Sequence, residues 1–128
     1  MAQKLTLVYF PVRARGEVPR MIMAYGDLPF TDTNCRQFFG CSFLTAKTCG
    51  KLPFGQLPVL IWPEDGTYMS QSGAILRALG IRFGYYPSDP MERWQVDSTL
   101  DAISDIYELV AKCYFGQSEL DKQNSLDL

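Results

Sequence analysis

The sequence contains no histidine, and this absence excludes several large classes of enzyme. Without an imidazole there is no Ser-His-Asp triad, no Cys-His nucleophile pair and no histidine-ligated zinc site. Any chemistry of this chain therefore depends on tyrosine, serine, cysteine, carboxylates or a bound molecule.

Long apolar runs and an excess of positive charge are also missing. The longest apolar run after the N-terminal segment covers residues 57–62, far short of the roughly 20 residues that span a bilayer, so we expect no membrane span. The 12 Lys and Arg residues are scattered and are outnumbered by 14 Asp and Glu residues, so we expect no nucleic-acid partner. Pro11 interrupts the apolar N-terminal stretch and Arg13 follows it, which predicts a cytoplasmic protein without a signal peptide.

The composition that remains is globular, with 128 residues, 47% hydrophobic and 20% charged. Residues 4–10 are rich in β-formers and predict a strand that ends at Pro11. Apolar residues at helical spacing predict a helix over residues 15–25, and residues 30–34 predict a second strand. Residues 35–51 have weak periodicity and are interpreted as a loop with one short helix.

The rest of the chain predicts a hairpin followed by two helices. Residues 57–62 form a buried type of strand, and after a turn residues 67–70 pair back with it. A helix is expected from residue 71 to about residue 83, and a long amphipathic helix over residues 91–115. Residues 117–128 are polar and are expected to fray.

A βαβ unit followed by a ββα unit is the plan of the thioredoxin fold. We therefore expect an α/β protein with a thioredoxin-like domain over residues 1–86 and a linker at residues 87–90. Residues 91–128 would then be one long helix of an incomplete, all-α second domain. Redox members of the fold carry Cys-x-x-Cys after the first strand, whereas Tyr9 stands in that neighbourhood here.

The four cysteines form no Cys-x-x-Cys motif, and three of them lie in one irregular stretch; they are Cys35, Cys41, Cys49 and Cys113. This pattern favours free thiols in a reducing compartment over a disulfide framework. A thiol–disulfide oxidoreductase using the first three has little support, because none lies at the first strand–helix junction.

Three ordered blocks stand at residues 7–20 (LVYFPVRARGEVPR), 52–60 (LPFGQLPVL) and 71–76 (QSGAIL). Together they resemble the glutathione-binding half of the cytosolic glutathione transferases, nearest to the sigma class, with mu and pi as neighbours. The resemblance implies a dimeric detoxification enzyme with glutathione as co-substrate. Its thiol would be activated as a thiolate for conjugation to, or isomerisation of, a small electrophilic substrate.

The resemblance implies that Tyr9 is catalytic and that its hydroxyl, a donor at neutral pH, hydrogen-bonds the glutathione sulfur. Each unit by which the thiol pKa falls corresponds to about 1.4 kcal/mol of preference for the thiolate. Arg15 is implied to add a helping cation. The alternative is that Tyr9 is an ordinary strand aromatic and Arg15 a solvated charge.

The bond between Leu57 and Pro58 matches the cis-proline position of thioredoxin-like folds, although a proline at a strand entry is the alternative. The resemblance implies that glutathione pairs with the Leu57 backbone as an added strand, with Gln56 beside it. Gln71 and Ser72 open a helix whose N–H groups would bind the γ-glutamyl carboxylate. Capping by Ser72 is the explanation that needs no ligand.

Two more groups of residues are carried over from the family. Lys47 matches the lysine that binds the glycyl carboxylate, and Phe43 stands where a tryptophan is usual. Asp97, Asp101 and Asp105 stack three like charges on one helix face, which is mildly destabilising. The resemblance implies that Asp105 reaches glutathione on the neighbouring subunit. A divalent cation binds such a face in some sigma-class members, but a solvated stripe is the alternative and we assign no metal ligand.

Family members continue well beyond this chain's length, so we expect either a fragment or a protein that has lost most of its second domain. This departure leaves a second hypothesis, in which the chain is a catalytically reduced, glutathione-transferase-like structural or interaction subunit of a larger assembly. Exposed apolar residues on the helix over residues 94–115 would then bind protein partners.

Overall fold

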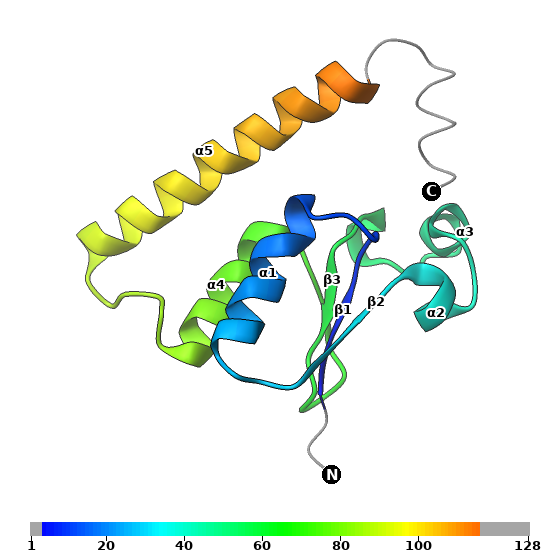
Figure 1. Ribbon diagram of the computed structural model, residues 1–128, viewed down its shortest axis with the longest axis horizontal. Coiled ribbons are helices and arrows are strands. Elements are labelled where there is room, and N and C mark those ends of the chain that lie inside the picture. Colours follow the sequence, from blue (N-terminus) through cyan, green and yellow to red (C-terminus); the bar gives the residue numbers. More distant parts are fainter. Residues whose placement is uncertain (1–3, 116–128) are drawn as a thin grey trace.

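The computed structural model describes residues 4–115, which form a four-stranded mixed sheet flanked by helices (Figure 1). The strands are β1 (Leu5–Val8), β2 (Phe30–Thr33), β3 (Val59–Ile61) and β4 (Tyr68–Ser70). Their order is β2-β1-β3-β4; β1 and β2 are parallel, and the other neighbouring pairs are antiparallel. The thioredoxin-like fold predicted from the βαβ-ββα pattern is confirmed, whereas the domain boundaries at 86 and 90 stay a prediction.

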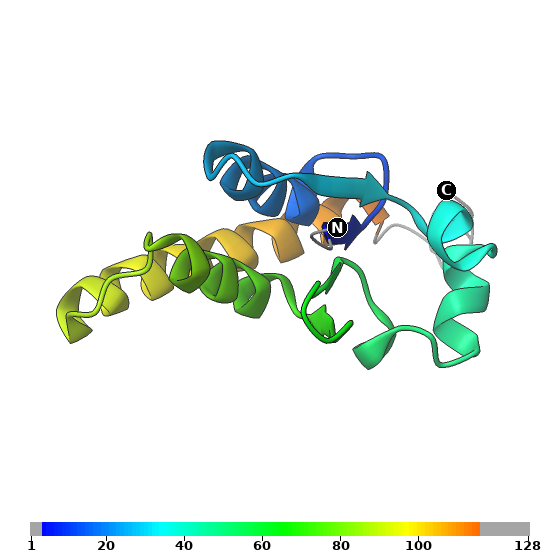
Figure 2. The same cartoon turned by 90° about the horizontal axis from the view of Figure 1, so that it is seen from below.

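Helices cover both faces of the sheet. They are α1 (Ala14–Tyr25), α2 (Cys35–Phe39), α3 (Phe43–Thr48), α4 (Ser72–Phe83) and α5 (Pro90–Phe115), with a short 3-10 turn η1 (Pro53–Gly55). Helices α1 and α4 pack side by side, while α2 and α3 lie on the other side of the sheet (Figures 1 and 2). None of the helices described is long and apolar enough to cross a bilayer. The predicted fraying of residues 117–128 lies outside the described residues.

Two apolar clusters hold the layers together, one on each face of the sheet. Leu7 and Val8 are successive residues of β1, so their side chains point to opposite faces, and both are fully buried. Leu7 belongs to the cluster beneath α1 and α4, and Val8 to the cluster beneath α2 and α3. Because both faces of β1 are covered, nearly all of its residues are apolar, as is typical of a central strand.

The prediction of a loop with one short helix over residues 35–51 is wrong, because two short helices occupy this stretch. Asn34 caps α2 by accepting a hydrogen bond from the Gln37 N–H at 3.0 Å, and Ser42 caps α3 in the same way. Gly40 ends α2 in the left-handed conformation, with φ of 71°. Each helix is shorter than two turns, so apolar periodicity had too little length to register.

Helix α5 lies across the body of the protein through polar contacts. Arg77 of α4 pairs with Asp97 at 2.8 Å and with Asp101 at 3.4 Å, and the Tyr86 hydroxyl donates to Asp97 at 2.9 Å. A cation and a hydroxyl therefore offset part of the repulsion in the acidic stripe. No group of three or more His, Cys, Asp or Glu side chains within residues 4–115 is arranged to hold a metal ion.

The apolar residues of α5 divide between two directions. Leu100 and Tyr107 are half-buried against the rest of the protein. The larger part of the apolar stripe is exposed: Trp94 61%, Ile103 41%, Val110 48% and Tyr114 81%. The periodicity predicted the helix correctly, but it did not identify the face that packs.

The Arg77–Asp97 ion pair makes stability depend on pH. Hydrogen bonding to Arg77 lowers the pKa of Asp97, so the pair stabilises the fold above the ordinary carboxyl pKa of about 3.9 and its contribution is lost as pH falls through the lower folded value. We expect thermal unfolding to show the largest gap between the unaltered chain and Asp97→Asn near neutrality, closing below about pH 4. Asp105→Asn is the control, since Asp105 has no ion pair within residues 4–115. A gap that stays constant with pH would contradict the prediction.

Candidate functional site

The register of the strands brings most of the singled-out residues to one end of the sheet. Val8 of β1 pairs with Val59 of β3, and Val59 pairs with Ser70 of β4. Tyr9, which follows β1, therefore lies at the same end as the residues that precede β3 and those that follow β4. The first turns of α1 and α4 start from this end, because each helix follows a strand that finishes there.

Tyr9 is the central side chain of this end. Only 6% of the residue is exposed, and its ring packs edge-on against Phe10 with centroids 5.4 Å apart. Its hydroxyl accepts a hydrogen bond from the Arg15 N–H at 3.2 Å, where α1 begins. Burial raises the pKa of Tyr9, so the phenol keeps its proton at neutral pH and can still donate it.

The structure turns the Arg15 side chain toward α5. Its guanidinium donates to the Ser104 hydroxyl at 3.0 Å and lies over the Tyr107 ring, 5.3 Å from the centroid. The direct contact of Arg15 with Tyr9 is therefore its main-chain N–H, whereas the sequence predicted a contribution from the cation. That cation still lowers the pKa of Tyr9, by less than burial raises it.

The peptide bond between Leu57 and Pro58 is cis, as predicted. Pro58 is buried, and the Leu57 side chain packs against both apolar clusters. Within residues 4–115, neither the N–H nor the C=O of Leu57 is hydrogen-bonded. Both backbone groups are thus available to an extended peptide that adds along this edge.

Phe43 and Lys47 are connected to the same end through aromatic contacts. The Phe43 ring meets Phe10 edge-on at 5.1 Å, and the Lys47 ammonium lies 6.0 Å from the Phe43 centroid. The Lys47 stem also lies against Gly55, where an added Cβ would be 3.4 Å from its Cγ. Gln56 follows directly and is exposed, so α3 and η1 place these residues beside the Leu57 edge.

The start of α4 contradicts the alternative in which Ser72 caps the helix. Gln71 holds the cap position with φ of 71° and makes no side-chain cap hydrogen bond, and Ser72 is the first helical residue. A positive φ at a residue with a side chain costs conformational energy, and such residues cluster at functional sites. The first N–H groups of α4 consequently lack a side-chain cap, which leaves them to another acceptor.

Asp105 is the one predicted site residue that stays apart. It is exposed on α5, and its side chain makes no hydrogen bond or ion pair within the part of the chain that the structure describes. The role implied by the resemblance lies on a neighbouring subunit, so the contacts of a single chain do not test it.

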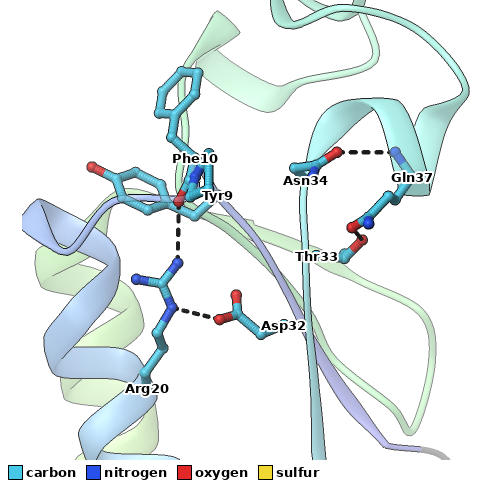
Figure 3. Close-up of a pocket in the computed structure, with 8 residues that line it drawn as sticks. Tyr9, Phe10, Arg20, Asp32, Thr33, Asn34 and Gln37 are labelled. Atoms are coloured by element: carbon cyan, nitrogen blue, oxygen red, sulfur yellow. Dashed lines mark hydrogen bonds and ion pairs between the residues drawn. The ribbon is translucent and has the colours of Figure 1, made fainter. Parts of the chain in front are cut away.

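A shallow pocket of about 170 Å³ opens on the other side of Tyr9, between the ends of β1 and β2 and the start of α2 (Figure 3). Its polar groups bind one another: Arg20 donates to Asp32 at 2.7 Å, and Thr33 donates to Gln37 at 3.1 Å. Since these groups already have partners, we assign no ligand to the pocket.

The sequence did not single out Gly16 and Arg20, although both contact Tyr9. A Cβ on Gly16 would lie 2.2 Å from the Tyr9 ring, and the Arg20 guanidinium lies 5.6 Å from the ring centroid. The two residues are four positions apart and share one face of α1. The sequence shows that Gly16 and Arg20 share a helix face, but it does not show that this face packs against Tyr9.

The four cysteines are free thiols, as predicted. Burial raises the pKa of the Cys35 thiol, which disfavours the reactive thiolate. The low support given to a thiol–disulfide oxidoreductase is consistent with this environment.

Known proteins resemble the chain over most of its length. Glutathione S-transferase 1 of Ascaris suum is 37% identical over 123 residues, which cover 94% of this chain and 56% of that protein. Glutathione S-transferase 2 of Caenorhabditis elegans is 36% identical over 121 residues, covering 91% of this chain and 61% of that protein. The solved structure of prostaglandin synthase D of Nilaparvata lugens has a TM-score of 0.73 and 31% identity, covering 96% of this chain and 58% of that one.

No family model matches the chain. The chain spans between half and two thirds of the length of these relatives. Their similarity nevertheless covers more than nine tenths of this chain. In sequence and in fold, the chain is similar to the cytosolic glutathione transferases.

Proposed function

We propose that the chain is the glutathione-binding part of a glutathione transferase and that it activates the glutathione thiol as a thiolate. The observation that carries this proposal is the Tyr9 hydroxyl, which accepts the Arg15 N–H at 3.2 Å and keeps its own proton. Donation from Arg15 polarises the phenol and strengthens the bond that its O–H makes to an anion. The thiol proton leaves to solvent, and the sulfur remains anionic against a neutral, buried donor.

The rest of the tripeptide binds along the same end of the sheet. The free N–H and C=O of Leu57 pair with the cysteinyl unit as an added strand, with Gln56 alongside. The γ-glutamyl carboxylate lies at the uncapped start of α4, at Gln71 and Ser72, where N–H groups and the helix dipole favour an anion. The ammonium group of Lys47, on α3, binds the glycyl carboxylate.

The thiolate attacks a small electrophile or assists its isomerisation, a chemistry suited to detoxification in the cytoplasm. We further propose a homodimer in which Asp105 of one subunit approaches glutathione on the other. The alternative of a catalytically reduced structural subunit has weaker support, because the curated relatives that cover most of this chain are named glutathione S-transferases.

Titration calorimetry with glutathione, combined with the ultraviolet absorbance of the thiolate, tests this proposal. We expect binding with release of the thiol proton to solvent, so that bound glutathione is ionised at neutral pH while free glutathione is not. S-methylglutathione is the control, because it offers the same backbone and carboxylates without an ionisable thiol. Absence of binding would favour the structural subunit, and binding without thiolate would contradict the role of Tyr9.

A further inference from the structure

Arg20 donates four hydrogen bonds, and Figure 3 shows two of them, to Asp32 and to the Phe10 carbonyl, beside Tyr9. Its Nε donates to Asp32 at 2.7 Å and its Nη2 to the Phe10 carbonyl at 3.2 Å. Its Nη1 donates to the Val12 carbonyl at 2.7 Å and to Glu17 at 3.4 Å. The side chain is only 17% exposed.

Two of these acceptors are main-chain carbonyls of the turn that joins β1 to α1. The turn is tight, because the Val12 N–H donates to the Phe10 C=O at 2.8 Å. A guanidinium is a planar, rigid fork of donors, so it holds two carbonyls at a fixed separation. Arg20 therefore fixes the path from Tyr9, the last residue before the turn, to Arg15 at the start of the helix.

The same guanidinium also lies over the Tyr9 ring, 5.6 Å from the centroid. Gly16, one helical turn earlier, touches the edge of that ring, so α1 holds it at two points. At the far end of the ring, the hydroxyl receives the Arg15 N–H. The position of the hydroxyl thus depends on both contacts.

We propose that Arg20 is a positioning residue for Tyr9: by fixing the β1–α1 turn and supporting the ring, it aims the hydroxyl at the glutathione sulfur without touching the substrate. This inference rests on the proposed thiol activation by Tyr9. Asp32 anchors the guanidinium from β2, which joins the turn to the sheet through one side chain.

Arg20→Met and Arg20→Lys test the proposal, with Arg82→Met as the matched control. Arg82 also pairs with a carboxylate at 2.7 Å and lies over an aromatic ring, but it contacts Glu64 and Trp62 beyond the other end of β3. The first measurement is hydrogen exchange of the Arg15 amide without ligand. We expect exchange about tenfold faster in Arg20→Met and faster also in Arg20→Lys, because a single ammonium does not replace the fork.

The second measurement is the pKa of glutathione bound to each variant. We expect a rise of about one unit in Arg20→Met, a smaller rise in Arg20→Lys and no change in Arg82→Met. A purely structural role would lower the unfolding temperature and leave both measurements unchanged, which would overturn the proposal. If Arg20→Met does not fold, the test rests on Arg20→Lys, which keeps the positive charge and most of the aliphatic stem.

The two measurements also separate this inference from the proposed function. Should the unaltered chain fail to bind glutathione, the proposed thiol activation fails, while faster exchange of the Arg15 amide would still establish that Arg20 positions the turn. Unchanged exchange in both Arg20 variants would overturn the positioning role whatever the result with glutathione.

Discussion

Replacement of Tyr9 by phenylalanine is expected to lower the rate of thiolate attack by roughly 10²- to 10³-fold while leaving glutathione affinity nearly unchanged. The substitution removes the proposed hydrogen bond to the sulfur but keeps the ring that packs against Phe10 and Gly16. Bound glutathione should then be protonated at neutral pH, which its ultraviolet absorbance reports directly. Calorimetry measures the affinity on the same samples.

Tyr107→Phe is the matched control for this prediction. The Tyr107 hydroxyl also reaches the start of α1, where it donates to the Ala14 carbonyl at 3.2 Å, and its ring lies under the Arg15 guanidinium. Loss of this hydroxyl removes a phenol close to Tyr9 and should leave the bound thiolate in place. If both variants lose the thiolate equally, the effect belongs to the packing of α1 and not to the Tyr9 hydroxyl.

Gly16→Ala is expected to destabilise the fold and displace Tyr9, even though alanine ordinarily favours a helix by about 1 kcal/mol. The added Cβ would lie 2.2 Å from Cδ1 and 2.8 Å from Cγ of the Tyr9 ring, which is too close for either atom to stay in place. Overpacking of this kind costs about 1–3 kcal/mol, so the net effect is a loss of stability. Because the ring must move, we also expect the bound thiolate to be lost.

Gly73→Ala provides the comparison, measured by chemical unfolding. Gly73 lies in the first turn of α4, where the nearest atom to an added Cβ is the flexible end of Arg77 at 3.1 Å. We expect this variant to unfold at the same denaturant concentration as the unaltered chain or at a slightly higher one. Equal stability of Gly16→Ala and Gly73→Ala would show that the Tyr9 ring is not tightly held.

The sequence predicted the long elements because their signals are local and repeated. The apolar run of β1 and the helical spacing of α1 and α4 extend over enough residues to distinguish a strand from a helix. Helices α2 and α3 were missed as separate elements because capping by Asn34 and Ser42, and not periodicity, defines them. Asn and Ser are also common in loops, so Asn34 and Ser42 did not distinguish short helices from a loop.

The places of the candidate residues in the fold were easier to predict than their contacts, and their roles stay predictions. The position of Tyr9 after β1 follows from an ordered motif, and the cis bond before Pro58 confirms one of the two alternatives that the sequence left open. The direction of the Arg15 side chain could not be predicted from a motif, because its partner Ser104 lies 89 residues away on α5. Likewise, nothing in the local sequence shows that Gln71 takes a positive φ and leaves Ser72 inside the helix.

The sequence by itself determined the succession of the strands and of the longer helices along the chain, the resemblance to the glutathione transferases, the exclusion of imidazole chemistry and a phenol at the end of the first strand. Tertiary structure alone decided that the Arg15 N–H bonds the Tyr9 hydroxyl, that Gly16 and Arg20 contact the Tyr9 ring, and that Arg77 pairs with Asp97 of the acidic stripe. Periodicity, turns and motifs act over a few neighbouring residues and can be read along the chain. The surroundings of a side chain are set by packing between distant segments, which becomes defined only when the sheet and its helices assemble.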